Sequence, residues 1–220
     1  MSETTLENLA PERRDGDAGA SNRREARRQA MMVAATDLFC TKGYGATSLS
    51  EVVKLSGGSL STLYDLFGNK AGLFRAIIED RCKSITELFQ RDDINDMPID
   101  EALGTFACIL IDHTMDDDTM AALRVILAES IQFPELGHLF YESGPAPSKA
   151  AVANYLAEQA KRGRLIVDDP RQAAEDFCAL VCGEAKMRGM CGLPTLMAGI
   201  DGKAQAQHAV SVFLRAYGPR

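Results

Sequence analysis

The side chains with the clearest chemical pattern in this 220-residue sequence lie in residues 47–70, TSLSEVVKLSGGSLSTLYDLFGNK. Hydroxyl groups stand at the start of two short apolar-periodic segments, and Gly57 and Gly58 separate those segments. Hydroxyl, phenol and ammonium groups are the kinds that contact phosphates and base edges in DNA complexes. Two short helices joined by a glycine-containing turn place the second helix in the major groove. The pattern therefore predicts a DNA-binding helix–turn–helix.

Capping signals divide residues 22–90 into four predicted helices. Ser48 and Glu51 have the S-x-x-E spacing of a capping box, and Ser59 and Asn69 stand where the next two helices would begin. Gly43 suits the left-handed residue that ends a helix. We expect helices at 23–42, from 48 to the glycine pair, at 60–66 and at 70–90, with the last linking this region to the rest.

Charge is distributed unevenly along the chain, whose net charge is −7. Residues 21–78 carry eight Lys/Arg and four Asp/Glu, whereas residues 79–220 carry fourteen Lys/Arg and twenty-two Asp/Glu. A basic head on an acidic body suits a chain that touches phosphates at one end only, although chance clustering of solvated charges is the alternative. Arg23/Arg27 and Arg24/Arg28 are like-charge pairs that phosphate or a narrow minor groove would stabilise. We expect residues 1–21 to be a disordered tail.

The ordered motifs resemble the DNA-binding head of the TetR family of bacterial transcriptional regulators. They are L-F-x-x-x-G-Y at 38–44, the pair Thr47-Ser48, T-[LI]-Y-x-x-F at 62–67 and then Lys70. Residues 129–145, ESIQFPELGHLFYESGP, are similar to the body of the AefR-like subgroup. The resemblance implies an all-α fold of about nine helices. An N-terminal helix–turn–helix domain at 22–90 would precede a larger effector-binding and dimerisation domain at 91–220.

The resemblance also implies roles in DNA binding. Arg24, Arg28, Thr47, Ser48, Tyr64 and Lys70 would hold phosphates or the minor groove, and Ser59, Leu60, Ser61 and Thr62 would face base edges. Gly58 stands where the family has a bulky apolar residue, so we expect a looser turn. Residues 59–66 contain no Arg, Asn or Gln, which make the strong bidentate base contacts. We therefore expect modest direct readout, assisted by DNA shape.

The body is expected to contain helices at 99–115, 119–130, 134–142, 147–162, 170–187 and 203–217. The acidic segment 112–118 is interpreted as a solvated loop, because it lacks the glycine and distal glutamate of a calcium loop. The resemblance implies that the last two helices pair with a second subunit, through Phe177, Val181, Val210, Phe213 and Leu214. It also implies an apolar effector pocket, for which the candidates are Phe106, His113, Met120, Phe133, Phe140 and Phe177. Packing within the chain's own core is the alternative for both sets.

The six cysteines are expected to be reduced thiols, because the N-terminal sequence is polar and does not resemble an export signal. Cys178 and Cys182 are four residues apart, which leaves a thiol-based redox sensor as an alternative function. Small buried apolar side chains are the favoured interpretation. No histidine completes a zinc site with them, and we expect neither a metal nor a cofactor.

The favoured function is a cytoplasmic homodimeric transcriptional regulator, usually a repressor. It would bind a palindromic DNA operator and be released by a small apolar effector. A ligand-independent, architectural DNA-binding dimer is a second possibility. The sequence shows no Ser/His/Asp order, phosphate-cradling glycine loop or metal triad, so we do not expect an enzyme. No apolar run is long enough to cross a bilayer, so we expect no membrane association.

Overall fold

Helices account for nearly all of the regular structure in the computed structural model of the chain, which describes residues 15–193 and 202–219. No strand occurs among those residues, so the predicted all-α fold is confirmed. The helices are α1 (Asp15–Lys42), α2 (Leu49–Ser56), α3 (Leu60–Phe67), α4 (Lys70–Phe89), α5 (Ile99–Met115), α6 (Asp117–Glu129), α7 (Pro134–Ser143), α8 (Pro145–Lys161), α9 (Pro170–Met190) and α10 (Gly202–Tyr217).

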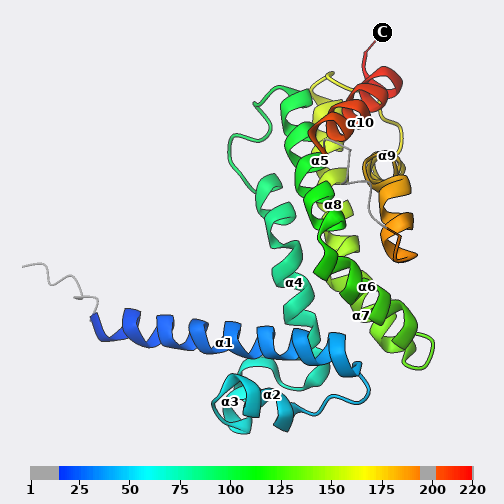
Figure 1. Cartoon of the computed structure of the whole chain (residues 1–220). Coiled ribbons are helices and arrows are strands. Elements are labelled where there is room, and N and C mark those ends of the chain that lie inside the picture. The colour runs from blue at the N-terminus through cyan, green and yellow to red at the C-terminus, as the bar shows by residue number, and fades with distance from the viewer. Residues whose placement is uncertain (1–14, 194–201, 220) are drawn as a thin grey trace, which may run out of the picture.

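The molecule consists of a head, formed by α1–α3 and the start of α4, and a body of upright helices (Figure 1). Helix α4 rises from the head into the body and links the two (Figure 1). One buried cluster joins α1–α4 and includes Ile126 of α6 and Leu136 of α7. A second cluster joins α5, α8, α9 and α10 with the end of α4. The head is therefore packed directly against the lower end of the body.

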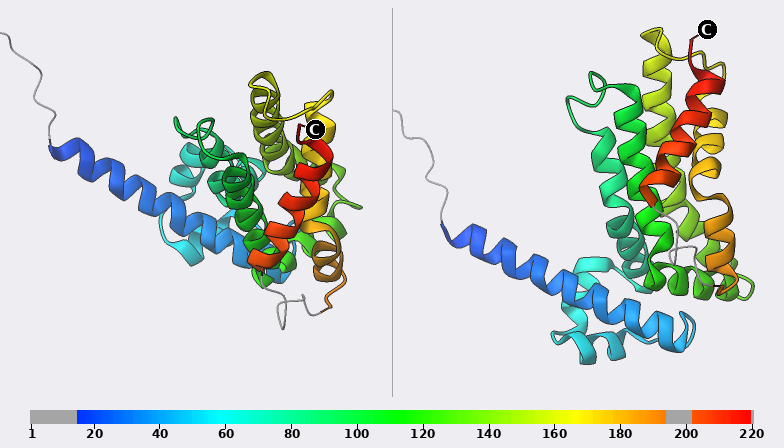
Figure 2. Two further views of the ribbon diagram at one scale, coloured as in Figure 1. Left: turned by 90° about the horizontal axis from the view of Figure 1, so that it is seen from above. Right: turned by 45° about the horizontal axis from the view of Figure 1, so that its top comes forward.

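The first predicted helix starts too late in the sequence. Helix α1 begins at Asp15, inside the predicted disordered tail 1–21, whereas residues 1–14 lie outside the described residues. Arg23 Nε donates a hydrogen bond to the Gly19 carbonyl at 3.1 Å, one turn earlier. Extending an existing helix costs far less than nucleating one, so a polar composition alone does not end it. The extra turns project away from the rest of the molecule (Figure 2).

The acidic segment 112–118 is not the predicted loop. Helix α5 runs to Met115 and α6 starts at Asp117, with Asp116 as the N-cap between them. Asp116 Oδ2 accepts hydrogen bonds from the Thr119 backbone N–H at 2.8 Å and from Thr119 Oγ1 at 2.6 Å. Aspartate is among the strongest N-cap residues, which is why an acidic cluster could start a helix here.

The residues predicted for a dimer interface are packed inside the chain's own body. Phe177 and Phe213 are fully buried with ring centroids 5.0 Å apart, and Val181 and Val210 are also buried. Leu214 packs against the same cluster. A helix turns its most apolar stripe toward the nearest core, and α9 and α10 face α5 and each other. Burial within the chain leaves Phe177, Val181, Val210 and Phe213 no exposed surface for a partner, whereas the half-buried Leu214 stays a prediction.

None of the helices in residues 15–193 or 202–219 combines the length and the apolarity that a membrane span requires.

Candidate nucleic-acid interface and effector cavity

Helices α2 and α3 form a helix–turn–helix with the predicted caps. The Ser48 side chain accepts from the Glu51 backbone N–H while the Glu51 carboxylate accepts from the Ser48 N–H, so the capping box is present. Ser59 Oγ accepts from the Thr62 N–H at 3.1 Å and lies 2.8 Å from both Ser61 Oγ and Thr62 Oγ1. These local hydrogen bonds fix where α2 and α3 begin.

The turn between α2 and α3 is open at Gly57 but contacts α1 at Gly58. Gly57 and Gly58 have positive φ angles of 73° and 109°. A Cβ built on Gly58 would come within 3.0 Å of Arg27 Nη1 and 3.1 Å of Met31 Cε. Side chains of α1 therefore occupy the space that a bulky residue at this position would fill. Arg27 is an exposed cation beside the helix–turn–helix, and its contact with the turn was not predicted from the sequence.

Helix α3 presents one polar face to solvent. Ser59, Leu60, Ser61 and Tyr64 are exposed, and Leu60 and Tyr64 keep 40% and 52% of their surface. Thr62 is half-buried. Leu63 and Phe67 lie in the head core. The structure therefore brings together the candidate base-reading residues, and only the face that bears them is available to a partner.

Thr47 does not present a hydroxyl to a phosphate. Its side chain is buried, with Oγ1 2.8 Å from the Gly43 carbonyl and 3.2 Å from the Leu38 carbonyl. It holds the loop between α1 and α2, so its predicted DNA contact is not supported by this geometry.

The start of α2 already holds an anion, the Glu51 carboxylate. Its Oε2 accepts from the Ser48 N–H and Oγ–H, both at 2.9 Å, and Oε1 lies 2.6 Å from Lys42 Nζ. The Lys42 hydrogen bond, followed by those of Ser48, lowers the pKa of Glu51 to about 2. Ser48 remains exposed, but a DNA phosphate would have to compete with Glu51 for its donors.

Lys70 holds the same loop and does not reach outward. Its Nζ donates to the carbonyls of Tyr44 at 2.6 Å, Thr47 at 2.8 Å and Gly45 at 3.3 Å. The ammonium also lies 4.5 Å from the centroid of the Tyr44 ring. An ammonium has three protons, and three carbonyls surround this one. Burial lowers the pKa of Lys70. The predicted direct phosphate contact is therefore replaced by a positioning role.

The arginines of α1 lie in its first half, and Lys42 ends the helix. Arg23, Arg24 and Arg27 are exposed. Arg28 is half-buried, 3.5 Å from the Glu25 carboxylate and 6.0 Å from the centroid of the Phe67 ring. Arg24 is thus available to DNA as predicted, whereas Arg28 is partly engaged within the head.

A cavity of about 420 Å³ lies in the body between α4, α5, α6, α7, α8 and α9. Four predicted pocket residues line it: Phe106, His113, Met120 and Phe140. The wall also includes three cysteines, Cys82, Cys178 and Cys182, which sequence reasoning did not assign to it. Its size and mostly apolar wall are typical of small-molecule sites.

Two predicted pocket residues lie elsewhere. Phe133 packs against the head, with its ring 6.4 Å from that of Tyr44. Phe177 is fully buried behind the cavity wall, 5.8 Å from the Phe106 ring. Helical periodicity identifies a residue as core but does not indicate which side of the core is hollow.

Burial favours the neutral form of two cavity thiols, Cys82 and Cys178. Burial raises the pKa of Cys178 to about 12 and also raises that of Cys82. Thiolates, not thiols, react with oxidants. This environment disfavours the thiol-based redox sensor.

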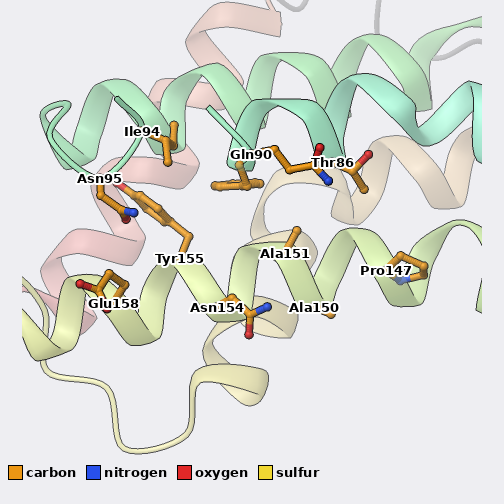
Figure 3. Close-up of a pocket in the computed structure, with 11 residues that line it drawn as sticks. Thr86, Gln90, Ile94, Asn95, Pro147, Ala150, Ala151, Asn154, Tyr155 and Glu158 are labelled. Atoms are coloured by element: carbon orange, nitrogen blue, oxygen red, sulfur yellow. The ribbon is translucent and has the colours of Figure 1, made fainter. Parts of the chain in front are cut away.

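A second hollow of about 470 Å³ lies on the outside of α4 and α8 (Figure 3). Short and amide side chains line most of it, and Tyr155 closes one end beside Asn95 (Figure 3). The Tyr155 hydroxyl is buried and, within the described part of the chain, has no hydrogen-bond partner. The only ionisable carboxylate of the lining, Glu158, is paired with Arg162 at 3.1 Å. The wall of this hollow is less apolar and less closed than that of the body cavity.

Comparison with known proteins decides the family. Residues 32–77 match the family described as bacterial regulatory proteins, tetR family. Residues 101–219 match the AefR-like transcriptional repressor, C-terminal domain. The chain belongs to the TetR family. It is therefore a DNA-binding transcriptional regulator by class, and this family is not one of enzymes.

Individual relatives agree with this TetR-family assignment. The HTH-type transcriptional repressor ComR of Escherichia coli (strain K12) is 29% identical over 145 residues, which are 63% of this chain and 67% of ComR. The solved flavonoid-responsive regulator FrrA is 32% identical, with a TM-score of 0.66, covering 88% of this chain and 98% of FrrA. A TetR-family regulator from Mesorhizobium loti, 24% identical, has the same fold, with a TM-score of 0.73 over 90% of this chain and 99% of that one.

Proposed function

We propose that this TetR-family chain is a homodimeric repressor that binds a palindromic operator in the cytoplasm and is released by a small molecule. The observation that carries the proposal is the exposed face of α3, with Leu60, Ser61 and Tyr64 side by side on a helix whose start is fixed by Ser59. Such a face, presented by a rigid helix–turn–helix, suits the major groove.

The proposed DNA contacts fall into two groups. Ser59, Leu60, Ser61 and Thr62 face bases, and Leu60 suits a thymine methyl. Tyr64, Ser48, Arg24 and Arg27 face phosphates or the minor groove. Thr47 and Lys70 belong to neither group, because their polar atoms bind the loop at 43–47. They position α2 and α3 instead.

The proposed dimer uses the outward faces of α9 and α10. On α9, Leu180 and Met187, on either side of the kink at Gly183, keep 36% and 55% of their surface exposed. On α10, Ala204 and Ser211 are exposed. Small and apolar residues on two adjacent helices permit close packing around a two-fold axis. That symmetry would place two α3 helices about 34 Å apart, one turn of DNA.

The proposed effector site is the body cavity. Helix α4 supplies Ile78 and Cys82 to its wall, and the same helix buries Leu73 and Phe74 in the head core. A ligand that moves α4 would therefore move α3. The solved relative FrrA is named for its response to flavonoids, which favours an aromatic effector.

A second link joins cavity and head through α6. Met120 and Ile126 line the cavity, and Glu129 at the end of the same helix accepts a hydrogen bond from the Gly45 N–H at 2.8 Å. The Gly45 loop is the one that Thr47 and Lys70 hold. An effector that binds the DNA-incompetent arrangement more tightly would shift the population toward it, and operator DNA would weaken effector binding by the same factor.

Selection of bound sites from random DNA, followed by titration of the selected site, tests the DNA-binding proposal. Ser61→Ala should change base preference, whereas Arg24→Gln should weaken all sites and reduce the salt slope of log K by about one. Lys161→Gln on α8 is the matched charge control and should change neither. Equal effects of Ser61→Ala on selected and scrambled sites would contradict the division of contacts.

A thermal-shift screen of small molecules, with and without operator, distinguishes the proposed repressor from a ligand-independent architectural dimer. A repressor with an effector site should give compounds that raise the melting temperature and lower operator affinity. Compounds that bind the cavity without changing operator affinity would support the architectural alternative.

A further inference from the structure

The cavity described above is apolar inside and charged at its edge. Its interior wall consists of aliphatic, aromatic and thiol side chains, among them Phe106, Leu110, Leu123 and Phe140. The charged side chains of α8 and α9 that line it are Lys149, Glu175 and Lys186. Lys149 and Glu175 keep 33% and 53% of their side-chain surface, so these groups lie at an opening and not in the interior.

The ammonium groups of Lys149 and Lys186 and the carboxylate of Glu175 line this opening. Lys149 Nζ lies 3.6 Å from Glu175 Oε1. Lys186 forms no ion pair within 4.0 Å among the described residues. Lys149 and Lys186 both line the cavity, as does Cys178, and both ammonium groups lower the pKa of the Cys178 thiol against the effect of burial. The opening therefore carries one positive charge in excess.

The other cation of the cavity is already neutralised. Arg81, on the α4 side, donates to Thr119 Oγ1 at 2.7 Å and lies 3.7 Å from Asp116 Oδ2. Burial and the nearby Arg81 lower the pKa of His113, so its imidazole is neutral at pH 7. At the lysine pair of α8 and α9, the positive charge of the lining is not balanced by carboxylates.

We propose that the ligand of this cavity is an organic anion, an apolar body bearing one carboxylate or phenolate group. The apolar part occupies the interior between α4, α5 and α6, and the acidic group lies between Lys149 and Lys186. A volume of about 420 Å³ accommodates a ligand of the size of two or three fused or linked rings. The inference rests on the proposed effector site and names its ligand class.

A matched pair of fluorescent probes tests the charge preference in the full chain without DNA. The probes are 8-anilinonaphthalene-1-sulfonate and N-phenyl-1-naphthylamine, which has the same rings without the anion. The sulfonate probe stands in for the acidic group. We expect Lys186→Met to weaken the anionic probe about tenfold and to leave the neutral probe within twofold. Glu175→Gln should tighten the anionic probe severalfold, because it removes the competing carboxylate.

Two further variants serve as controls. Lys83→Met removes an exposed charge of α4 outside the cavity and should change neither probe. Cys178→Phe fills the cavity and should weaken both probes, with the circular dichroism spectrum showing that the variant is folded. Retention of both probes by folded Cys178→Phe would place them elsewhere and overturn the inference.

Operator binding of the same proteins, measured without probe, distinguishes a failure of the anion inference from a failure of the proposed function. If the wild type binds its selected site but Lys186→Met weakens both probes equally, or weakens neither, the anion inference is wrong and the proposed function stands. If the wild type binds no selected DNA site, the proposed function fails, whatever the probes show.

Discussion

Replacing Lys70 with methionine should destabilise the head before it affects any contact with DNA. Methionine keeps the length of the lysine stem but removes the ammonium group that joins the carbonyls of Tyr44, Gly45 and Thr47. Since these carbonyls belong to the loop before α2, its loss should release the loop and loosen the start of α2.

The magnitude follows from the hydrogen bonds. Two of the three contacts, at 2.6 and 2.8 Å, are short, charge-assisted hydrogen bonds, and one with good geometry contributes about 1.5 to 3 kcal/mol. Lys70 is partly exposed, so water replaces part of the loss. We expect the free energy of unfolding to fall by about 3 kcal/mol. Lys70→Arg should also destabilise, because a planar guanidinium cannot direct its protons at the same three carbonyls.

Urea unfolding and the salt dependence of DNA binding together test this prediction. Lys54→Met is the matched control, since Lys54 is an exposed cation of α2 in the same head. The control should change stability by less than about 0.5 kcal/mol. If Lys70→Met leaves stability unchanged and instead reduces the salt slope of log K by about one, Lys70 contacts a phosphate and the positioning role is refuted.

Four other substitutions test separate features of the structure. Tyr155→Phe should raise the free energy of unfolding by about 1 kcal/mol in urea denaturation, because it removes a buried hydroxyl that has no partner among the described residues. Tyr217→Phe should lower the same free energy by about 1 kcal/mol, because it removes a 2.6 Å hydrogen bond to Asp176. Gly58→Leu should lower the melting temperature and cost about 2 kcal/mol or more, since φ is 109° and Arg27 fills the adjacent space; an unchanged melting temperature would contradict this packing. The lowered pKa of Glu51, about 2, stabilises the folded state above the ordinary carboxyl pKa near 4.5 and loses that effect as pH falls toward 2. Glu51→Gln should therefore flatten the acid side of a plot of melting temperature against pH, and an unchanged plot would contradict the assigned role.

Local signals in the sequence predicted the starts of α2, α3, α4 and α9 well. The caps at Ser48, Ser59, Asn69 and Asp169 all accept the hydrogen bonds that their residue types indicate. A cap depends only on the residue and the next few backbone N–H groups, so it can be predicted without the tertiary fold. The exposed face of α3 followed from the same periodicity that buries Leu63.

Roles that depend on tertiary contacts could not be predicted in this way. Thr47 and Lys70 bind carbonyls at sequence separations that no spacing rule covers, up to 26 residues for Lys70 and Tyr44. Phe177 and Phe213 form a regular apolar stripe, but periodicity cannot tell a core-facing stripe from a subunit-facing one. The contact of Arg27 with Gly58 could not be predicted, because the two residues lie side by side only in the folded head.

The residues that line the cavity were predicted only in part, because the lining also depends on tertiary contacts. Phe106 and Met120 were identified by residue type and helix position, which locate the middle of the body. The lysines of the opening were not, because Lys149 and Lys186 lie on different helices and read as solvated charges in the sequence. Only the fold shows that both lysines line the same cavity.

Selection of bound DNA sites by the full chain tests the central proposal most directly. Two α3 helices related by a two-fold axis should enrich a palindrome whose half-sites are about one helical turn apart. The selected site should bind two copies of the chain, and Ser61→Ala should shift the enriched bases within each half-site. Failure to enrich any sequence, or enrichment of a single unrepeated half-site bound by one copy, would contradict a dimeric repressor that reads DNA through α3.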